Sequence, residues 1–237
     1  MEKYILIHIP HSSLYIPRIY KKISLVSEEE LEKENIFMCD NKIDELIDNK
    51  EQSLIFNYSR LYCDVERFRD DSEIMNKYGM GYIYTKTSTG KKIFDSPSLS
   101  HKKEIDLIYE NHHKKLDDYV TRILNKYNKC IIIDLHSYSD HQVANLFNYQ
   151  NTPDICLGTE EAYYNQELID TIKEYFENYG YSVMLNYPYS GSIIPNKYFN
   201  KTNTNIVSIM IELNKKIYID NFDEFKIIFN NLLEKLK

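Results

Sequence analysis

The sequence predicts an α/β fold, with a mixed, mostly parallel sheet sandwiched by helices. Short apolar runs recur along the chain without the polar alternation of half-exposed strands, which is typical of parallel strands buried on both faces. Segments with helical spacing of apolar residues lie between these runs, and such alternation favours an α/β architecture. The 237 residues, 43% of them hydrophobic, can bury a large core, and no Pro/Gly/Ser-rich linker divides them. We therefore expect a single domain over residues 1–237.

The individual elements follow from local signals. Apolar runs predict strands at residues 4–9, 53–58, 130–134, 181–185 and 206–213. Ser27 and Glu30 have the spacing of a capping box, which predicts the start of a helix. Further helices are predicted at about residues 100–127, 162–179 and 223–236, and Gly180 is placed to end the second of these three. Two short apolar stretches around Thr89-Gly90 predict a hairpin within residues 80–94.

Composition and charge exclude several classes of function. The chain has 29 Lys and Arg against 36 Asp and Glu, a net charge of -7, and no basic stripe, so we expect no nucleic-acid partner. The apolar run at residues 4–9 is too short to span a membrane, and no signal-peptide cleavage pattern follows it. We therefore expect a cytoplasmic protein without a membrane partner. The four cysteines form no C-x-x-C pair and are expected to be reduced and buried. The sequence does not predict the oligomeric state.

Polar residues follow three of the predicted strands. His11 comes after the first strand, His136 after the run at 130–134, and Glu212 ends the run that begins at Ile206. The carboxyl ends of parallel strands meet at one edge of a sheet, where sites form. Zinc binds imidazole and carboxylate ligands, and a catalytic zinc keeps one position open for water. The three residues together predict a catalytic zinc centre.

Each of these residues also has a structural alternative. His11 could cap the loop at Ser12-Ser13, and His136 could be a hydrogen-bonded core histidine behind Asp134. Glu212 is harder to explain in this way, because a buried carboxylate is costly unless it is paired, neutral or functional. Glu212 is therefore the sharpest single signal in the sequence.

Four further residues are candidates with open alternatives. Arg67 offers a planar guanidinium suited to a substrate carboxylate, or it neutralises the acidic residues beside it. His113 lies within a predicted helix and is either functional or an ordinary core histidine. Asp40 and Asp44 have the i, i+4 spacing of one helical face and are either ligands or solvated surface residues.

The order of these motifs resembles the N-formylglutamate amidohydrolase family of zinc-carboxypeptidase-like (phosphorylase/hydrolase-like) α/β hydrolases. Each motif is short, and the resemblance depends on their order along nearly the whole chain. The motifs are Ile9-Pro10-His11-Ser12-Ser13, Cys39-Asp40, Asn57-Tyr58-Ser59-Arg60, Asp64-Val65-Glu66-Arg67, His112-His113, Asp134-Leu135-His136-Ser137, Pro153-Asp154-Ile155-Cys156-Leu157-Gly158-Thr159, Asn186-Tyr187-Pro188-Tyr189-Ser190-Gly191 and Ile211-Glu212-Leu213-Asn214.

The resemblance implies a cytoplasmic, zinc-dependent hydrolase of a linear amide such as N-formylglutamate, an enzyme of histidine catabolism with a small acyl amino acid as its partner. It implies one zinc ion per chain, held by His11, an acidic residue and His136, with Glu212 as general base. Asp40 is the favoured acidic ligand, with Asp44 or Asp64 as alternatives. The resemblance also implies a set of substrate-binding residues: Arg67, His113, Tyr189, Ser190 and Gly191.

The chain departs from the family pattern at three positions. Glu66 stands where Asn is usual, Lys215 where Arg is common, and Ser192 where a second Gly is common. A carboxylate at position 66 would repel a substrate carboxylate unless it points away or is protonated. The rivals are a related zinc peptidase or cell-wall amidase, and a non-catalytic relative that binds a ligand.

Overall fold

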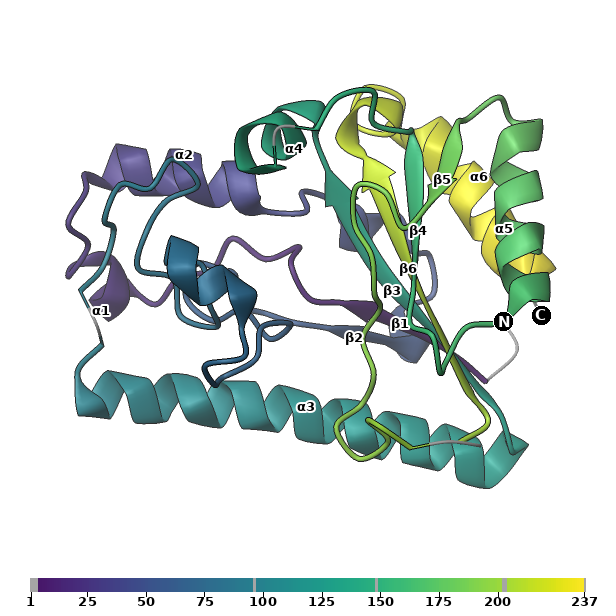
Figure 1. Cartoon of the computed structure of the whole chain (residues 1–237), viewed down its shortest axis with the longest axis horizontal. Coiled ribbons are helices and arrows are strands. Elements are labelled where there is room, and N and C mark those ends of the chain that lie inside the picture. The colour runs from purple at the N-terminus through teal and green to yellow at the C-terminus, as the bar shows by residue number, and fades with distance from the viewer. Residues whose placement is uncertain (1–3, 96, 148, 202–203, 237) are drawn as a thin grey trace. The chain divides into compact units, whose positions relative to one another are not determined.

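The computed structural model describes residues 4–95, 97–147, 149–201 and 204–236 (Figure 1). By their internal contacts these residues divide into two compact units. The first unit comprises residues 4–9, 42–55 and 116–236, and the second comprises residues 10–41 and 56–115. The expected single domain stays a prediction.

Six strands of the first unit form one sheet in the order β2-β1-β3-β6-β4-β5. All neighbouring strands are parallel except β4 and β6, which are antiparallel. The predicted mixed, mostly parallel sheet with flanking helices is therefore confirmed. The strands are β1 (Ile5–Ile9), β2 (Ser53–Ile55), β3 (Cys130–Tyr138), β4 (Ile155–Thr159), β5 (Val183–Leu185) and β6 (Ile206–Asn214).

The helices of the first unit cover its apolar core. α5 and α6 lie next to each other beside the sheet (Figure 1), and the rings of Phe176 and Phe225 stack between them at a centroid distance of 6.3 Å. The C-terminal turns of α3 add Leu116, Val120 and Ile123 to the same core. The helices of the whole chain are α1 (Arg18–Lys21), α2 (Glu28–Met38), α3 (Leu99–Tyr127), α4 (Asp140–Phe147), α5 (Gln166–Asn178) and α6 (Phe222–Lys235), with short 3₁₀ turns at Ile43–Glu45, Lys50–Gln52, Ile74–Tyr78 and Lys215–Ile217.

Local signals set the helix ends as predicted. The Ser27 side chain accepts the Glu30 N–H, and the Glu30 carboxylate accepts the Ser27 N–H, so the capping box at α2 is formed. Gly180 follows the end of α5 with a φ of +85°, a conformation that costs glycine little. Local sequence signals therefore set the start of α2 and the end of α5.

Several predicted elements differ from the structure. β3 continues through His136 to Tyr138, because β6 pairs with it along that whole length. β2 stops at Ile55, where the chain passes into the second unit. The predicted hairpin is reduced to isolated antiparallel bridges, Met80 with Tyr84 and Lys86 with Lys92.

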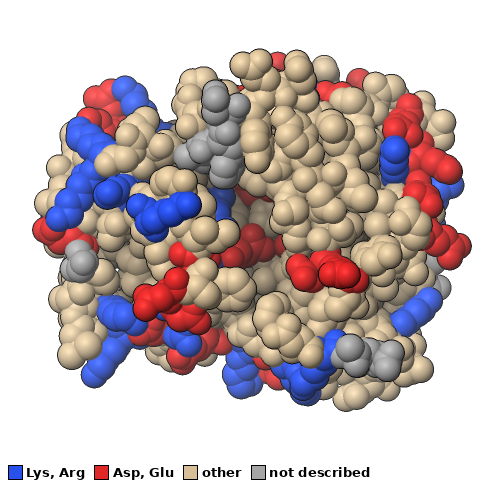
Figure 2. Space-filling view, viewed as in Figure 1, with Lys and Arg blue, Asp and Glu red and all other residues tan. Residues whose placement is uncertain are grey.

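The surface agrees with the charge pattern of the sequence. Acidic and basic side chains are interspersed on the face drawn in Figure 2. Among the described residues, no helix is both long enough and apolar enough to cross a membrane.

Candidate metal and catalytic site

Asp64 organises the polar centre of the second unit. Its Oδ2 accepts hydrogen bonds from Arg60 Nη2 at 2.8 Å and from the Tyr84 hydroxyl at 3.2 Å, and its Oδ1 accepts from the Glu66 N–H at 3.1 Å. Burial opposes the ionisation of Asp64, but Arg60 and His11 outweigh that penalty and hold its pKa well below the usual range. Asp64 is therefore a buried, ionised carboxylate whose two oxygens already serve protein groups.

His11 is turned toward this carboxylate. Its Nε2 lies 2.8 Å from Asp64 Oδ1, and because a carboxylate only accepts, Nε2 carries the proton. Burial, supported by the charge of Arg60, lowers the pKa of His11, although Asp64 acts in the opposite direction. The imidazole is thus neutral near pH 7, and the Nδ1 lone pair has the character of a metal ligand.

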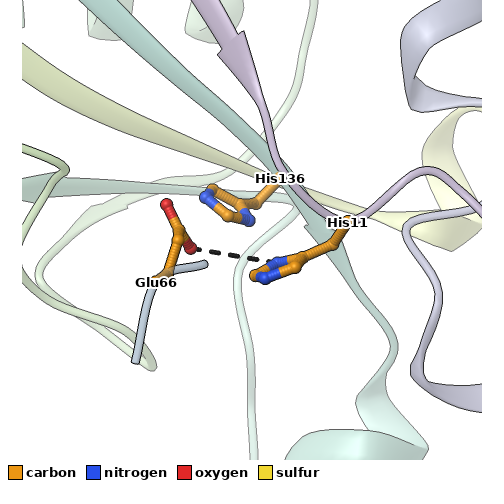
Figure 3. A group of neighbouring side chains, drawn as sticks. All are labelled: His11, Glu66 and His136. Atoms are coloured by element: carbon orange, nitrogen blue, oxygen red, sulfur yellow. Dashed lines mark ion pairs between the residues drawn. The ribbon is translucent and has the colours of Figure 1, made fainter. Parts of the chain in front are cut away.

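Two carboxylates lie at equal distance from His11 Nδ1. Asp40 Oδ2 and Glu66 Oε2 are each 3.8 Å away, and the Glu66 pair is drawn in Figure 3. The Asp40 N–H also donates to the His11 carbonyl at 2.9 Å, which fixes this predicted ligand beside the histidine. The sequence interpretation had placed Glu66 toward the substrate. Its proximity to His11 was missed because residues 64–68 form a loop, which has no periodicity to reveal side-chain directions.

Asp44, an alternative acidic ligand, lies beside a lysine. Asp44 lies in a 3₁₀ turn, with Oδ2 3.1 Å from Lys50 Nζ. The expectation that Asp40 and Asp44 share one helical face is wrong, because α2 ends at Met38 and Lys42 adopts a left-handed φ of 61°. The backbone direction changes between the two acids.

In the first unit, His136 and Glu212 occupy paired positions on the neighbouring strands β3 and β6. Paired residues of adjacent strands point to the same face of the sheet. Asp134 lies two residues before His136 and pairs with His8 of β1, so all four side chains share that face. The sequence predicts His136 and Glu212 near strand ends, and the register of the sheet puts the two side by side.

Asp134 holds the histidines of this face. His8 Nδ1 lies 2.8 Å from Asp134 Oδ1, the Ile193 N–H donates to Oδ2 at 2.9 Å, and His136 Nε2 is 3.2 Å from Oδ1. Burial opposes the charge on Asp134, but His136 and His8 overcome it and keep the pKa of Asp134 far below its usual value. A carboxylate behind an imidazole fixes the orientation of the ring and raises its basicity as a ligand. The predicted alternative of a core histidine beside Asp134 agrees with this short distance, and the role of His136 as a ligand stays a prediction.

Glu212 is buried, with 7% of its surface exposed. Its paired residue on β4 is Cys156, and Tyr138 lies two positions beyond His136 on β3. Burial chiefly raises the pKa of Cys156 to about 12, and the charge of Glu212 adds to that effect. The thiol therefore stays protonated and is a poor nucleophile, and the role of Glu212 as general base stays a prediction.

The predicted substrate-binding residues Tyr189, Ser190 and Gly191 lie in a loop fixed on the strands of the first unit. The Tyr189 carbonyl accepts the Cys156 thiol at 3.1 Å, and its ring packs on Tyr138 at 5.7 Å. Their role toward a substrate stays a prediction. Gly158 of β4 lets the loop come close, since a Cβ at this position would lie 2.4 Å from the Gly191 carbonyl oxygen.

We expect Gly158→Ala to destabilise the protein by about 1–3 kcal/mol, because the methyl group overlaps a backbone oxygen that cannot move aside cheaply. Urea unfolding measures this change. Gly90→Ala is the comparison, because Gly90 has no atom within 4 Å of an added Cβ and tests only the strain of its φ of +85°. A Gly158→Ala protein as stable as the wild type would contradict the close approach of the loop.

Arg67 and His113 lie in the second unit. Arg67 Nε is 3.8 Å from Asp64 Oδ2, whereas Arg60 binds the same oxygen at 2.8 Å. Arg60, rather than Arg67, therefore neutralises most of the charge of Asp64. The Arg67 side chain is 27% exposed, against 13% for Arg60, and so has more access to an external anion. His113 Nε2 is 2.8 Å from the Val65 carbonyl and is committed to the backbone.

Among the described residues, each unit offers donors for a metal ion. The second unit offers His11 and Glu66 and the first offers His136, the three side chains drawn in Figure 3. Two imidazoles and one carboxylate are the donor set of catalytic zinc sites with an open position. Within the second unit Glu66 lies as near to His11 as Asp40 does, so Glu66 joins Asp40 as a candidate for the acidic ligand.

Comparison with known proteins gives a consistent result. The family model described as N-formylglutamate amidohydrolase matches residues 4–219. An N-formylglutamate amidohydrolase from Ralstonia eutropha JMP134 has a similar structure, with a TM-score of 0.77 and 19% identity over 91% of this chain and 83% of its own. The gene product Atu2144 from Agrobacterium tumefaciens has a TM-score of 0.69 and 16% identity, over 99% of this chain and 92% of its own. No curated protein matches the chain. The match of the family model over most of its length shows that the chain belongs to the N-formylglutamate amidohydrolase family.

Proposed function

We propose that the protein is a zinc-dependent amidohydrolase that cleaves the amide bond of a small N-acyl amino acid, N-formylglutamate among them. The observation that carries the proposal is that two histidines are each backed by an ionised carboxylate, His11 by Asp64 and His136 by Asp134. Metal-binding histidines typically have such a carboxylate partner, which selects the ring nitrogen that binds. The donor set fits zinc, and we assign His11, Glu66 and His136 as its ligands, with Asp40 as the alternative acid.

The connectivity of the chain supports a joint site. His11 follows the last residue of β1 by two positions, and β1 pairs with β3 in parallel, with His8 opposite Asp134. Strands rise about 3.3 Å per residue. The chain beyond β1 therefore starts at the level of His136, which favours one shared ion over two separate ones.

A zinc ion bound there would lower the pKa of a coordinated water toward about 7 and polarise the amide carbonyl. Glu212 is the general base in this proposal. It takes the proton of the attacking water and passes it to the leaving nitrogen, so that the amine departs neutral as the C–N bond breaks. Arg67 binds the carboxylate of the acyl amino acid through its planar guanidinium.

The Glu66 carboxylate lies beside His11 Nδ1. This position bears on whether Glu66 would repel the carboxylate of the substrate. As a ligand, Glu66 shares its charge with the cation and presents little repulsion to an anion at Arg67. The unusual residue is therefore compatible with a carboxylate-bearing substrate.

The test is amide hydrolysis by zinc-reconstituted protein, with free amine as the measured product. The substrates are N-formylglutamate, N-formylglutamine, a formylated amine without a carboxylate, and a short peptide. We expect turnover of the first two and little of the formylated amine, because that compound has no anion for Arg67. Turnover of the peptide alone would instead favour a related zinc peptidase, and zinc binding without any turnover would favour a ligand-binding relative.

A further inference from the structure

Glu66 and Arg67 lie in a loop without regular secondary structure. A loop backbone is held only by the contacts that other elements make with it, and a displacement of about 1 Å in a functional group can cost much of its activity. The groups that fix residues 65–68 therefore decide where the Glu66 carboxylate and the Arg67 guanidinium lie.

Two side chains of α3 bind the carbonyls on either side of Glu66. His113 Nε2 is 2.8 Å from the Val65 carbonyl, and the Tyr109 hydroxyl donates to the Arg67 carbonyl at 3.0 Å. Because a carbonyl only accepts, Nε2 of His113 carries a proton and cannot itself bind a metal. Tyr109 and His113 are one helical turn apart, both buried, with ring centroids 4.3 Å apart. Together they hold the loop through two of its backbone carbonyls.

Two N–H groups of the loop are also bound. The Glu66 N–H donates to Asp64 Oδ1 at 3.1 Å, and the Phe68 N–H donates to Glu73 Oε2 at 2.9 Å. The guanidinium of Arg69 lies 4.9 Å above the Tyr109 ring, and its Nη1 is 2.9 Å from Glu110 Oε1. The loop is therefore fixed at both ends, and Tyr109 and His113 hold its centre.

We propose that Tyr109 and His113 are positioning residues, which place the Glu66 carboxylate beside His11 and hold the Arg67 backbone, without touching the substrate. The proposal rests on the metal-dependent function above, and it moves His113 from the predicted substrate-binding set to the support of the loop. Groups in this position behind a metal ligand typically change metal affinity by about 10- to 100-fold when they are lost.

Tyr109→Phe removes one hydroxyl and keeps the ring, and Tyr82→Phe is the matched control. The Tyr82 ring packs on Tyr109 at 5.9 Å, but its hydroxyl donates to Asp106 Oδ1, outside the loop. The first readout is amide hydrogen exchange of Glu66 and Phe68 in the metal-free protein. We expect about five- to tenfold faster exchange in Tyr109→Phe, as loss of one hydrogen bond predicts, and no change in Tyr82→Phe.

The second readout is zinc affinity, measured by competition with a chromophoric chelator. We expect Kd to rise about tenfold in Tyr109→Phe and to stay within about twofold in Tyr82→Phe. His113→Gln can still donate an N–H to the Val65 carbonyl, so its amide exchange rates and its Kd for zinc should stay near those of the wild type. His113→Leu cannot donate, so both the exchange rates and the Kd should rise.

The outcomes separate the two proposals. Wild-type protein that binds no zinc would overturn the metal-dependent function, and the exchange readout would still decide the role of the two residues. Exchange at Glu66 and Phe68 that is equal in wild type and Tyr109→Phe would overturn their positioning role. Equal losses of zinc affinity in Tyr109→Phe and Tyr82→Phe would overturn it as well, since they would reflect general destabilisation.

Discussion

His136→Ala is expected to abolish zinc binding. The wild type should hold about one zinc ion per chain, and the variant close to none, because the site loses one of its two imidazole ligands. Loss of a group behind a ligand already costs about 10- to 100-fold in affinity, so loss of the ligand itself should cost more than about 100-fold. Elemental analysis after dialysis against a weak chelator measures the occupancy.

His141→Ala is the matched control, since His141 is an exposed histidine five residues further along the chain. It should keep the zinc content of the wild type. Thermal unfolding of both metal-free variants checks that the fold survives, because Asp134 keeps His8 and the Ile193 N–H as partners when His136 is removed. A full zinc complement in a folded His136→Ala protein would remove His136 from the ligand set.

Glu212→Gln is expected to lower kcat by about 10²- to 10⁴-fold while the zinc content stays that of the wild type. The amide has the shape of the carboxylate but cannot accept the proton of the attacking water. Glu212 lies outside the proposed ligand set, so metal affinity should not follow the loss of turnover. Hydrolysis of N-formylglutamate and zinc content are measured on the same preparations.

Glu34→Gln provides a control of the same chemistry. Glu34 is also buried, and its carboxylate accepts the Ser88 N–H at 2.6 Å and the Ser88 hydroxyl at 3.1 Å. This variant should retain the kcat of the wild type. Full turnover in Glu212→Gln would exclude Glu212 as the base, and loss of zinc in that variant would make it a ligand instead.

Much of the fold could be predicted from the sequence, because it depends on local signals. The apolar runs of β1, β3 and β6 predict buried strands whatever their neighbours are. Two parts could not be predicted in this way. β4 contains the small Gly158 and lies against a loop, and the extent of β3 depends on pairing with β6, which is more than 60 residues away in sequence.

For the candidate site, the apolar runs predict that His11, His136 and Glu212 stand at or near strand ends, and parallel strands bring such ends to one edge of a sheet. Which carboxylate lies beside which imidazole follows from three-dimensional contacts alone. Asp64 lies 53 residues from His11 and binds its Nε2, and Glu66, two residues on, lies beside Nδ1. Neighbouring acids of a loop can point in different directions, and no periodicity predicts which way each one turns. The roles of Asp40, Asp64 and Glu66 therefore depend on three-dimensional contacts, which the spacing of the residues does not encode.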